Sequence, residues 1–249
     1  MEFWDCNLNY GPQTSGEDLK CCGNIDELQN ELERAGISGG LVIKTLKEAV
    51  LANNSLAEDI KNKQNLKGVW QILPSCTNEI ASPYDLPKSM RQNNIGALTI
   101  NPKAHRYLPR KFVIGDYLDM ARERKIPVLL NTSRGITLEQ IDDIMRDFPD
   151  LTVILTFDDC WPSDRFLRPF LDAYPNLCLD MTYMLTDSGL KDMIKYSDCS
   201  GRILFGSGFP ICYMGAHILV IKHAEISEED KRKIAGGNLK RLLEGANYD

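Results

Sequence analysis

The stretch Arg202-Ile203-Leu204-Phe205-Gly206-Ser207-Gly208-Phe209-Pro210 is the clearest indication of the fold, because a short apolar run leads into Gly, Ser and Pro. The run Ile203–Phe205 has the composition of a buried strand, and small or cyclic residues end it. Seven similar runs precede it, and most are bounded by Gly, Pro or Asn. They are Phe3–Asn7, Leu41–Lys44, Gly68–Leu73, Gly96–Ile100, Pro127–Leu130, Thr152–Phe157 and Leu177–Asp180.

Longer amphipathic segments with helix-capping residues separate these apolar runs. Asn24 can cap one helix, and Thr137 with Gln140 forms a capping-box pattern ahead of another. Further helix starts are Ser163, Asp187 and Ser227. The pair Gly236-Gly237 is expected to bend the last helix or to split it in two.

The alternation of strands and helices predicts parallel strands joined by right-handed crossovers. The chain has 249 residues, which leaves about 31 for each of eight units, the size of a strand with its helix. An eightfold α/β barrel typically has about 250 residues. We therefore predict an α/β protein whose residues 1–249 form a single (β/α)8 TIM barrel domain, regular or distorted. No G-x-G-x-x-G follows any run, which argues against a dinucleotide site.

The composition is that of an ordinary globular protein, with 43% hydrophobic and 26% charged residues. A net charge of −6 argues against nucleic-acid and membrane partners. No apolar run reaches the roughly 18 residues of a membrane span, and the acidic N-terminus does not resemble a signal peptide. We therefore expect a cytoplasmic protein whose eight cysteines are mostly buried apolar residues. A homodimer is compatible with such a barrel.

Function in such a barrel belongs to the C-terminal ends of the strands. Here those ends are rich in amides, hydroxyls, carboxylates and aromatic rings, which is typical of a small-molecule pocket. The candidate ligand-binding residues are Asn7, Asn9, Asn131, Arg134, Trp161 and Asp180. Cations that can hold a carboxylate or phosphate, or can remain solvated, are Lys44, Lys103 and Arg134. Rings that can wall the pocket, or can pack the barrel top, are Trp161, Tyr183, Phe209 and Tyr213.

The stretch 202–210 resembles the strand-eight motif L-F-G-[ST]-D-x-P of amidohydrolase-related, metal-dependent hydrolases. Trp4–Gly11 is similar to the family's opening I-D-x-H-x-H-x-G, and Ile126–Thr132 to its strand-five P-V-x-x-H-T. The ending Lys233–Leu243 is similar to the family's terminal helix K-I-x-x-x-N-A-x-R-L-x. The resemblance covers nearly the whole chain and implies the metal-dependent-hydrolase type of barrel.

The resemblance implies a divalent metal held by four histidines and one aspartate. At those positions this sequence has Asn7, Asn9, Asn131, Phe157 and Gly208. An Asn amide binds zinc poorly, Phe has no donor atom and Gly has no side chain. The three histidines of the chain lie elsewhere. We therefore expect no metal and no other cofactor, and the Asn residues either keep a polar cavity or satisfy one another in a decayed site.

Three hypotheses for the function follow. The favoured one is an amidohydrolase-like pseudoenzyme that binds a small polar or carboxylate ligand at the rim of the barrel. The first alternative is a metal-independent hydrolase or lyase with Asp5, Asp158 or Asp159 as acid and base, although Asp5 and Asp180 are expected chiefly to anchor the backbone or other polar groups. The second is a scaffold protein with a decayed site. Lesser alternatives are a thiol nucleophile, at Cys160 or Cys212, and a magnesium or calcium site among the carboxylates.

Overall fold

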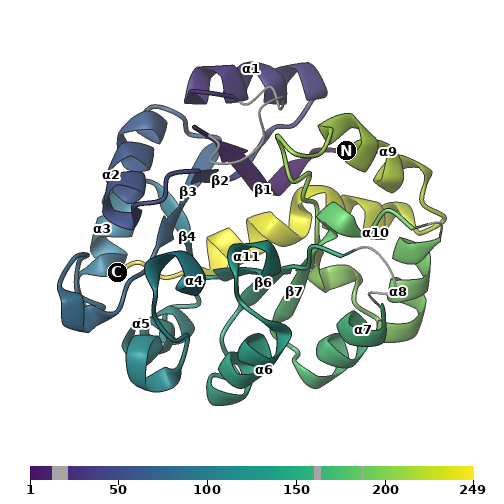
Figure 1. Ribbon diagram of the computed structural model, residues 1–249. Coiled ribbons are helices and arrows are strands. Elements are labelled where there is room, and N and C mark those ends of the chain that lie inside the picture. The colour runs from purple at the N-terminus through teal and green to yellow at the C-terminus, as the bar shows by residue number, and fades with distance from the viewer. Residues whose placement is uncertain (13–21, 160–163, 187) are drawn as a thin grey trace.

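The computed structural model describes residues 1–12, 22–159, 164–186 and 188–249. Its strands lie in sequence order in one eight-stranded sheet, and neighbouring strands are parallel (Figure 1). The strands are β1 (Trp4–Tyr10), β2 (Gly39–Lys44), β3 (Leu66–Gln71), β4 (Ile95–Thr99), β5 (Val128–Asn131), β6 (Val153–Thr156), β7 (Leu177–Asp180) and β8 (Ile203–Leu204). Each strand overlaps a predicted apolar run, with bounds that differ by up to three residues.

Hydrogen bonds between the last strand and the first close the sheet into a barrel. The amide of Cys6 donates to the carbonyl of Phe205 over 2.8 Å, and the amide of Asn9 donates to that of Phe209 over 2.9 Å. A parallel bridge also joins Leu8 to Phe209. The predicted α/β barrel is therefore confirmed.

Helices surround the sheet, as the alternating pattern predicts, and the last helix crosses one end of the barrel (Figure 1). They are α1 (Ile25–Ala35), α2 (Ala49–Ile60), α3 (Leu86–Gln92), α4 (Pro102–His105), α5 (Lys111–Glu123), α6 (Leu138–Asp147), α7 (Asp164–Ala173), α8 (Gly189–Ser197), α9 (Met214–His223), α10 (Glu228–Arg232) and α11 (Asn238–Gly245). The predicted caps at Asn24 and Ser227 and the capping box of Thr137 with Gln140 are confirmed. The predicted starts at Ser163 and Asp187 lie outside the described residues. No helix in the described ranges is both long and apolar enough to cross a membrane.

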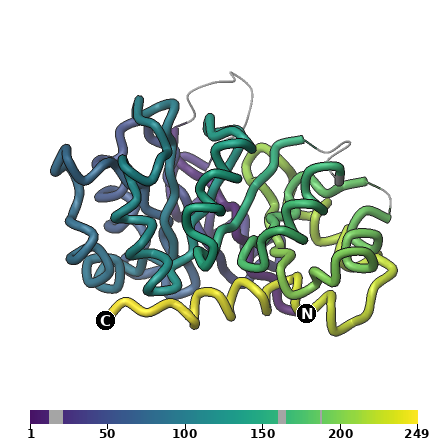
Figure 2. The backbone as a smooth tube through the Cα atoms, turned by 90° about the horizontal axis from the view of Figure 1, so that it is seen from below, coloured from purple at the N-terminus to yellow at the C-terminus, as the bar shows by residue number. Residues whose placement is uncertain are grey.

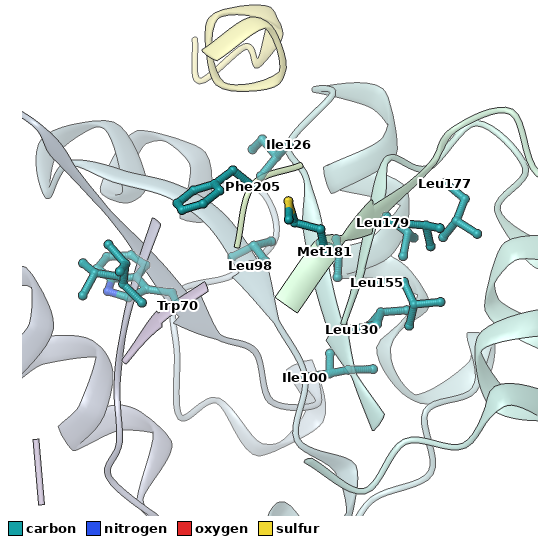
Figure 3. Packing of buried hydrophobic residues seen from close by; sticks show 14 of the residues in the cluster. Trp70, Leu98, Ile100, Ile126, Leu130, Leu155, Leu177, Leu179, Met181 and Phe205 are labelled. Carbon is teal, nitrogen blue, oxygen red and sulfur yellow. The ribbon is translucent and has the colours of Figure 1, made fainter. Parts of the chain in front are cut away.

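Two hydrophobic clusters hold the barrel together. The larger one fills the space between the sheet and the helices, where Trp70, Leu98 and Leu130 pack with other apolar residues (Figure 3). The smaller one lies inside the barrel and takes two residues from β2 and one from each other strand and from α11. Its buried members are Cys6, Leu41, Ile43, Val69, Ala97, Leu129, Ile154, Cys178, Leu204 and Leu239. Alternate side chains of a strand point to opposite faces, so this cluster identifies the inward positions of each strand.

The C-terminal helical segment lies across the end of the barrel where the strands begin (Figure 2). Leu239 of α11 joins the inner cluster, and Gly236 passes so close to β1 that a Cβ atom there would lie 3.0 Å from the carbonyl oxygen of Glu2. The predicted irregularity at Gly236-Gly237 is a π-helical turn, Lys233–Gly237, between α10 and α11. One end of the barrel is therefore covered, and the end where the strands finish is left for the site.

Candidate functional site

A layer of polar side chains lies above the inner apolar cluster, at the C-terminal ends of the strands. In most strands, the next inward-pointing residue after the cluster member is the last residue of the strand, and it carries a hydrogen-bonding group. These residues are Gln71, Thr99, Asn131, Thr156 and Asp180. All except Asn131 are buried. We call this set the mouth layer. Its position is where barrel enzymes place their functional groups.

A bulge in β1 adds two asparagines to the mouth layer. The pairing of β1 with β2 shifts by one residue between Asp5 and Leu8. Cys6 therefore lies in the inner cluster, whereas Leu8 belongs to the outer one. A bulge changes the direction of the side chains that follow it, and here it lets both Asn7 and Asn9 reach residues of the mouth.

Four of the predicted ligand-binding residues form one chain of hydrogen bonds across the mouth. Arg134 Nη2 donates to Asn9 Oδ1 over 2.8 Å, and Asn9 Nδ2 donates to Asn7 Oδ1 over 3.1 Å. Asn7 Nδ2 then donates to Asp180 Oδ2 over 2.9 Å. Asn7 and Asn9 are partners of one another, and they also link a cation to a buried carboxylate. Asn131 is not part of this chain and accepts from Ser133 instead.

Asp180 is the centre of this network, because both of its oxygens accept two hydrogen bonds. Oδ1 accepts from the amide and the hydroxyl of Thr182, at 2.9 and 2.7 Å. Oδ2 accepts from Asn7 Nδ2 and from the Thr156 hydroxyl, at 2.9 and 2.7 Å. His217, which is also buried, places Nε2 2.7 Å from the carbonyl oxygen of Thr182 and so supports the same turn. The carboxylate of Asp180 is therefore used to hold the mouth together.

Arg134 is a cation at the edge of the mouth without a carboxylate partner among the described residues. It ends a 3-10 turn, Thr132–Arg134, which Asn131 caps by accepting hydrogen bonds from Ser133 N and Oγ at 2.9 and 2.7 Å. Asn131 thus positions Arg134 through this turn. The loss of hydration on burial lowers the pKa of the Arg134 guanidinium to about 10, so the group remains a cation at neutral pH.

Asp5, a predicted catalytic candidate, lies against the backbone that follows β8. Its carboxylate accepts hydrogen bonds from Asn7 N at 2.8 Å and from Ser207 N at 3.1 and 3.2 Å. The side chain is fully buried. Burial is the main cause that raises the pKa of Asp5 to about 6, and the charge of Asp180 adds to it. This arrangement is that of an anchor between β1 and β8, which is the role that the sequence favoured.

The raised pKa of Asp5 predicts that stability falls as pH increases from about 4 to about 6. The folded protein holds the Asp5 proton more tightly than the unfolded chain, so the contribution is complete below the unfolded pKa of 3.8. This difference between the folded and unfolded pKa of Asp5 lowers the free energy of unfolding by about 3 kcal/mol at neutral pH, relative to low pH. Urea unfolding from pH 4 to 7 should show this loss in the wild type and a flatter profile in Asp5→Asn. Parallel profiles for the two proteins would contradict the prediction.

The other predicted residues lie around the mouth or away from it. Asp158 is exposed and accepts a hydrogen bond from the Thr132 hydroxyl, and Asp159 is exposed beside it. Lys44 is paired with Asp59 of α2, so it is not free for a ligand, and Lys103 is exposed. Trp161 and Cys160 lie outside the described residues.

The predicted aromatic wall is divided between two places. Tyr183 is half-buried after β7. Phe209 and Tyr213 instead line a cavity of about 290 Å³ between α1 and α9, outside the barrel. Cys212 is also half-buried, and burial raises the pKa of its thiol, which makes it a poor nucleophile. Two further cavities, of about 440 and 300 Å³, lie beside α2–α3 and beside α8–α9.

Residues 99–244 match the family model described as amidohydrolase. The chain belongs to the amidohydrolase family. No curated protein matches this chain in sequence.

Solved structures share the fold of this chain at low sequence identity. An uncharacterized TIM-barrel protein from Bordetella bronchiseptica has 20% identity and a TM-score of 0.72, over 98% of this chain and 99% of its own. The 2,6-dihydroxybenzoate decarboxylase from Rhizobium has 15% identity and a TM-score of 0.70, over 98% of both chains. A manganese-bound 5-carboxyvanillate decarboxylase from Novosphingobium aromaticivorans has 12% identity and a TM-score of 0.73, over 98% and 96%. These likenesses concern the fold alone.

At three positions where the amidohydrolase resemblance implies metal ligands, the structure shows other contacts or little space. The amide of Asn7 is occupied by Asn9 and Asp180, and the Phe157 ring packs 6.2 Å from that of Phe166. A Cβ atom at Gly208 would lie 2.5 Å from Thr182 Cγ2, and the φ angle of Gly208 is +64°. Across the described ranges, no three His, Cys, Asp or Glu side chains gather closely enough to hold a metal ion.

The space around Gly208 predicts the effect of restoring the family's aspartate. Gly208→Asp should lower the free energy of unfolding by about 2–4 kcal/mol, because the left-handed backbone and the Thr182 methyl group both oppose a side chain. Urea unfolding measures this loss, and Gly201→Asp is the control because no atom lies within 4 Å of a Cβ built there. Equal stability of Gly208→Asp and the wild type would contradict the prediction.

Several residues that build this site are not among the residues predicted for it. They are Gln71, Thr99, Thr156, Thr182 and His217. The alternation of side chains along a strand reveals Gln71, Thr99 and Thr156. Each lies two residues after an inward-pointing apolar residue and is the last residue of its strand. Thr182 and His217 act through contacts that only the folded chain creates.

Proposed function

We propose that this amidohydrolase barrel binds a small carboxylate-bearing molecule at its mouth, with Arg134 as the partner of the carboxylate. The observation that carries the proposal is the half-buried guanidinium of Arg134, which donates to Asn9 Oδ1 and has no carboxylate partner in the described part of the chain. A guanidinium that has lost hydration gains most from a bidentate carboxylate, because two charge-assisted hydrogen bonds replace the lost water.

The proposal includes no divalent metal at the family's ligand positions, so this protein is a pseudoenzyme for metal-dependent hydrolysis. Asn7, Phe157 and Gly208 are occupied, apolar or without space for a ligand side chain. Binding of the carboxylate then depends on the charge and the donors of Arg134. Zinc and manganese are the metals whose presence would be expected if this part of the proposal were wrong.

Aromatic acids are the class of carboxylate that we propose to test first. The decarboxylases that share the fold are named for dihydroxybenzoate and carboxyvanillate. In this chain the half-buried rings of Phe157 and Tyr183 follow β6 and β7, at the same end of the barrel as Arg134. A flat apolar ring with one carboxylate matches this combination of aromatic surface and a cation.

The proposal is tested by thermal unfolding of protein purified without chelator, together with its metal content. Benzoate should raise the melting temperature, whereas benzamide, which has the same shape without the charge, should not. Elemental analysis should find no stoichiometric metal. Equal shifts with benzoate and benzamide, or no shift with benzoate, would overturn carboxylate binding. Stoichiometric zinc or manganese would overturn the metal-free part.

A metal-independent hydrolase or lyase is the second candidate, and Asp158 is the observation that favours it. Its carboxylate is exposed after β6, and Oδ1 accepts from the Thr132 hydroxyl, while Oδ2 has no partner among the described residues. Such a carboxylate can move a proton to or from a ligand. Turnover that is lost in Asp158→Asn while binding remains would favour this candidate. A scaffold role would instead leave the protein without response to any small molecule.

A further inference from the structure

The side-chain amide of Gln71 is the one member of the mouth layer that the network leaves without a partner in the described part of the chain. Gln71 is the last residue of β3 and is only 4% exposed. Its Oε1 atom is buried and accepts no hydrogen bond from any described residue. Buried polar groups are almost always paired, because an unpaired one loses its hydration without compensation. An orphaned acceptor of this kind requires a reason.

The neighbours of Gln71 in the mouth layer show that the layer is otherwise well satisfied. The Thr99 hydroxyl, on the adjacent strand β4, donates to the carbonyl of Leu129 over 2.9 Å. The Thr156 hydroxyl donates to Asp180 over 2.7 Å. Poor packing of the whole layer therefore does not explain the missing partner of Gln71.

The backbone of Gln71 is held firmly, so the unpartnered side chain is not part of a loose segment. Asn53 of α2 is itself buried. Its Nδ2 donates to the backbone carbonyl of Gln71, and its Oδ1 accepts from the backbone N–H of Gln71, both at 2.8 Å. The indole of Trp70 donates to the carbonyl of Asn53 over 3.0 Å. Through this pair of bonds, Asn53 is a positioning residue that fixes the backbone from which the Gln71 side chain extends.

We propose that the Gln71 side-chain carbonyl accepts a hydrogen bond from a hydroxyl of the bound ligand. The inference rests on the proposed function for the carboxylate, and it adds a second point of recognition on another strand of the same mouth. A ligand with both a carboxylate and a hydroxyl satisfies Arg134 and Gln71 together. A site built to pair with a hydroxyl rejects an analogue that lacks it, because its own polar group then remains unpaired.

The test compares five probes by calorimetry: benzoate, the three monohydroxybenzoates and phenol. At least one hydroxybenzoate should bind the wild type about tenfold more tightly than benzoate. Gln71→Met, which keeps the length of the side chain without its amide, should abolish that tenfold preference and the binding of phenol, and leave the affinity for benzoate unchanged. Gln92→Met, the same exchange at an exposed position of α3 outside the mouth layer, is the control. It should leave the preference intact.

Unfolding of the ligand-free variants supplies a readout that does not depend on binding. Gln71→Met should keep or raise the urea midpoint, since it removes a buried group without a partner, whereas Thr99→Val, which removes a neighbouring hydroxyl that already has a partner, should lower it. A lowered midpoint in Gln71→Met would overturn the inference, because it would show that the amide has a structural partner.

The binding outcomes separate this inference from the proposed function. If benzoate binds through Arg134 but hydroxylation brings no gain, or Gln71→Met leaves the gain unchanged, the inference is overturned and the proposed function stands. If phenol and a hydroxybenzoate depend on Gln71 while Arg134→Gln changes nothing, the inference stands and the carboxylate proposal falls. If no probe binds the wild type, both are overturned.

Discussion

Replacement of Asp180 by alanine should lower the free energy of unfolding by about 4 kcal/mol or more. The carboxylate accepts hydrogen bonds from Asn7, Thr156 and twice from Thr182, and all of these residues are buried. Each buried donor that loses its partner costs about 1–3 kcal/mol. A protein of ordinary stability has only about 5–15 kcal/mol, so the variant should be close to unfolding at 37 °C. Urea unfolding at 25 °C measures the loss.

Two further variants show whether this loss comes from the hydrogen bonds of Asp180. Asp180→Asn keeps one carbonyl oxygen for Thr182 but turns an amide toward the donors of Asn7 and Thr156, so its stability should lie between the wild type and Asp180→Ala. Asp150→Ala, at an exposed position, should change stability by less than about 0.5 kcal/mol. If Asp180→Ala lost no more stability than Asp150→Ala, Asp180 would not be the centre of the hydrogen-bond network at the mouth.

Replacement of Arg134 by glutamine should weaken benzoate binding about 10- to 100-fold. Hydrogen bonds to charged groups contribute about 1.5–3 kcal/mol, and each 1.4 kcal/mol is a factor of ten in affinity. Glutamine removes the charge and keeps a shorter, neutral amide at this position. Calorimetric titration with benzoate at fixed ionic strength measures the change.

The Arg134 experiment needs a cation elsewhere as its control. Arg146 lies on the surface of α6, with an exposed side chain that pairs with Asp142. Arg146→Gln should therefore leave benzoate affinity unchanged. Arg134→Lys keeps the charge without the fork of donors and should bind benzoate with intermediate affinity. If Arg134→Gln and Arg146→Gln had the same affinity as the wild type, the carboxylate would bind at another place or only by general charge.

The variants of Asp180 and of Arg134 test separate parts of the site. Asp180 holds the ends of β1, β6 and β7 together. Arg134 is joined to that framework only through Asn9. Loss of Arg134 should therefore affect the ligand with little effect on the fold, and loss of Asp180 should affect both. In a ligand-binding barrel, this division lets the cation vary while the framework remains.

Much of the fold follows from local patterns in the chain. Each of the eight apolar runs became a strand, because short β-rich runs between turn residues repeat at a spacing that fits strand and helix units. The capping box of Thr137 formed because both of its hydrogen bonds are made within four residues. The extent of a single domain over residues 1–249, the homodimer and the cytoplasmic location stay predictions.

The candidate site depends more strongly on long-range contacts. Asn7, Asn9, Arg134 and Asp180 are predicted from their places at strand ends, and the structure brings these four into one network. Gln71 is not predicted from the sequence, because a glutamine at the end of an apolar run has no local mark of function. Its missing partner is visible only when every neighbour in the mouth layer is known.

The amino-acid sequence by itself determined the order and type of the elements and the residues at the strand ends, since these depend on periodicity and on neighbours close in the chain. Only the tertiary structure decided what those residues do. The bulge that brings Asn7 toward the mouth depends on pairing with β2, and the contact of Asn9 with Arg134 joins positions 125 residues apart. Such contacts leave no local pattern, because barrel closure and strand register create them.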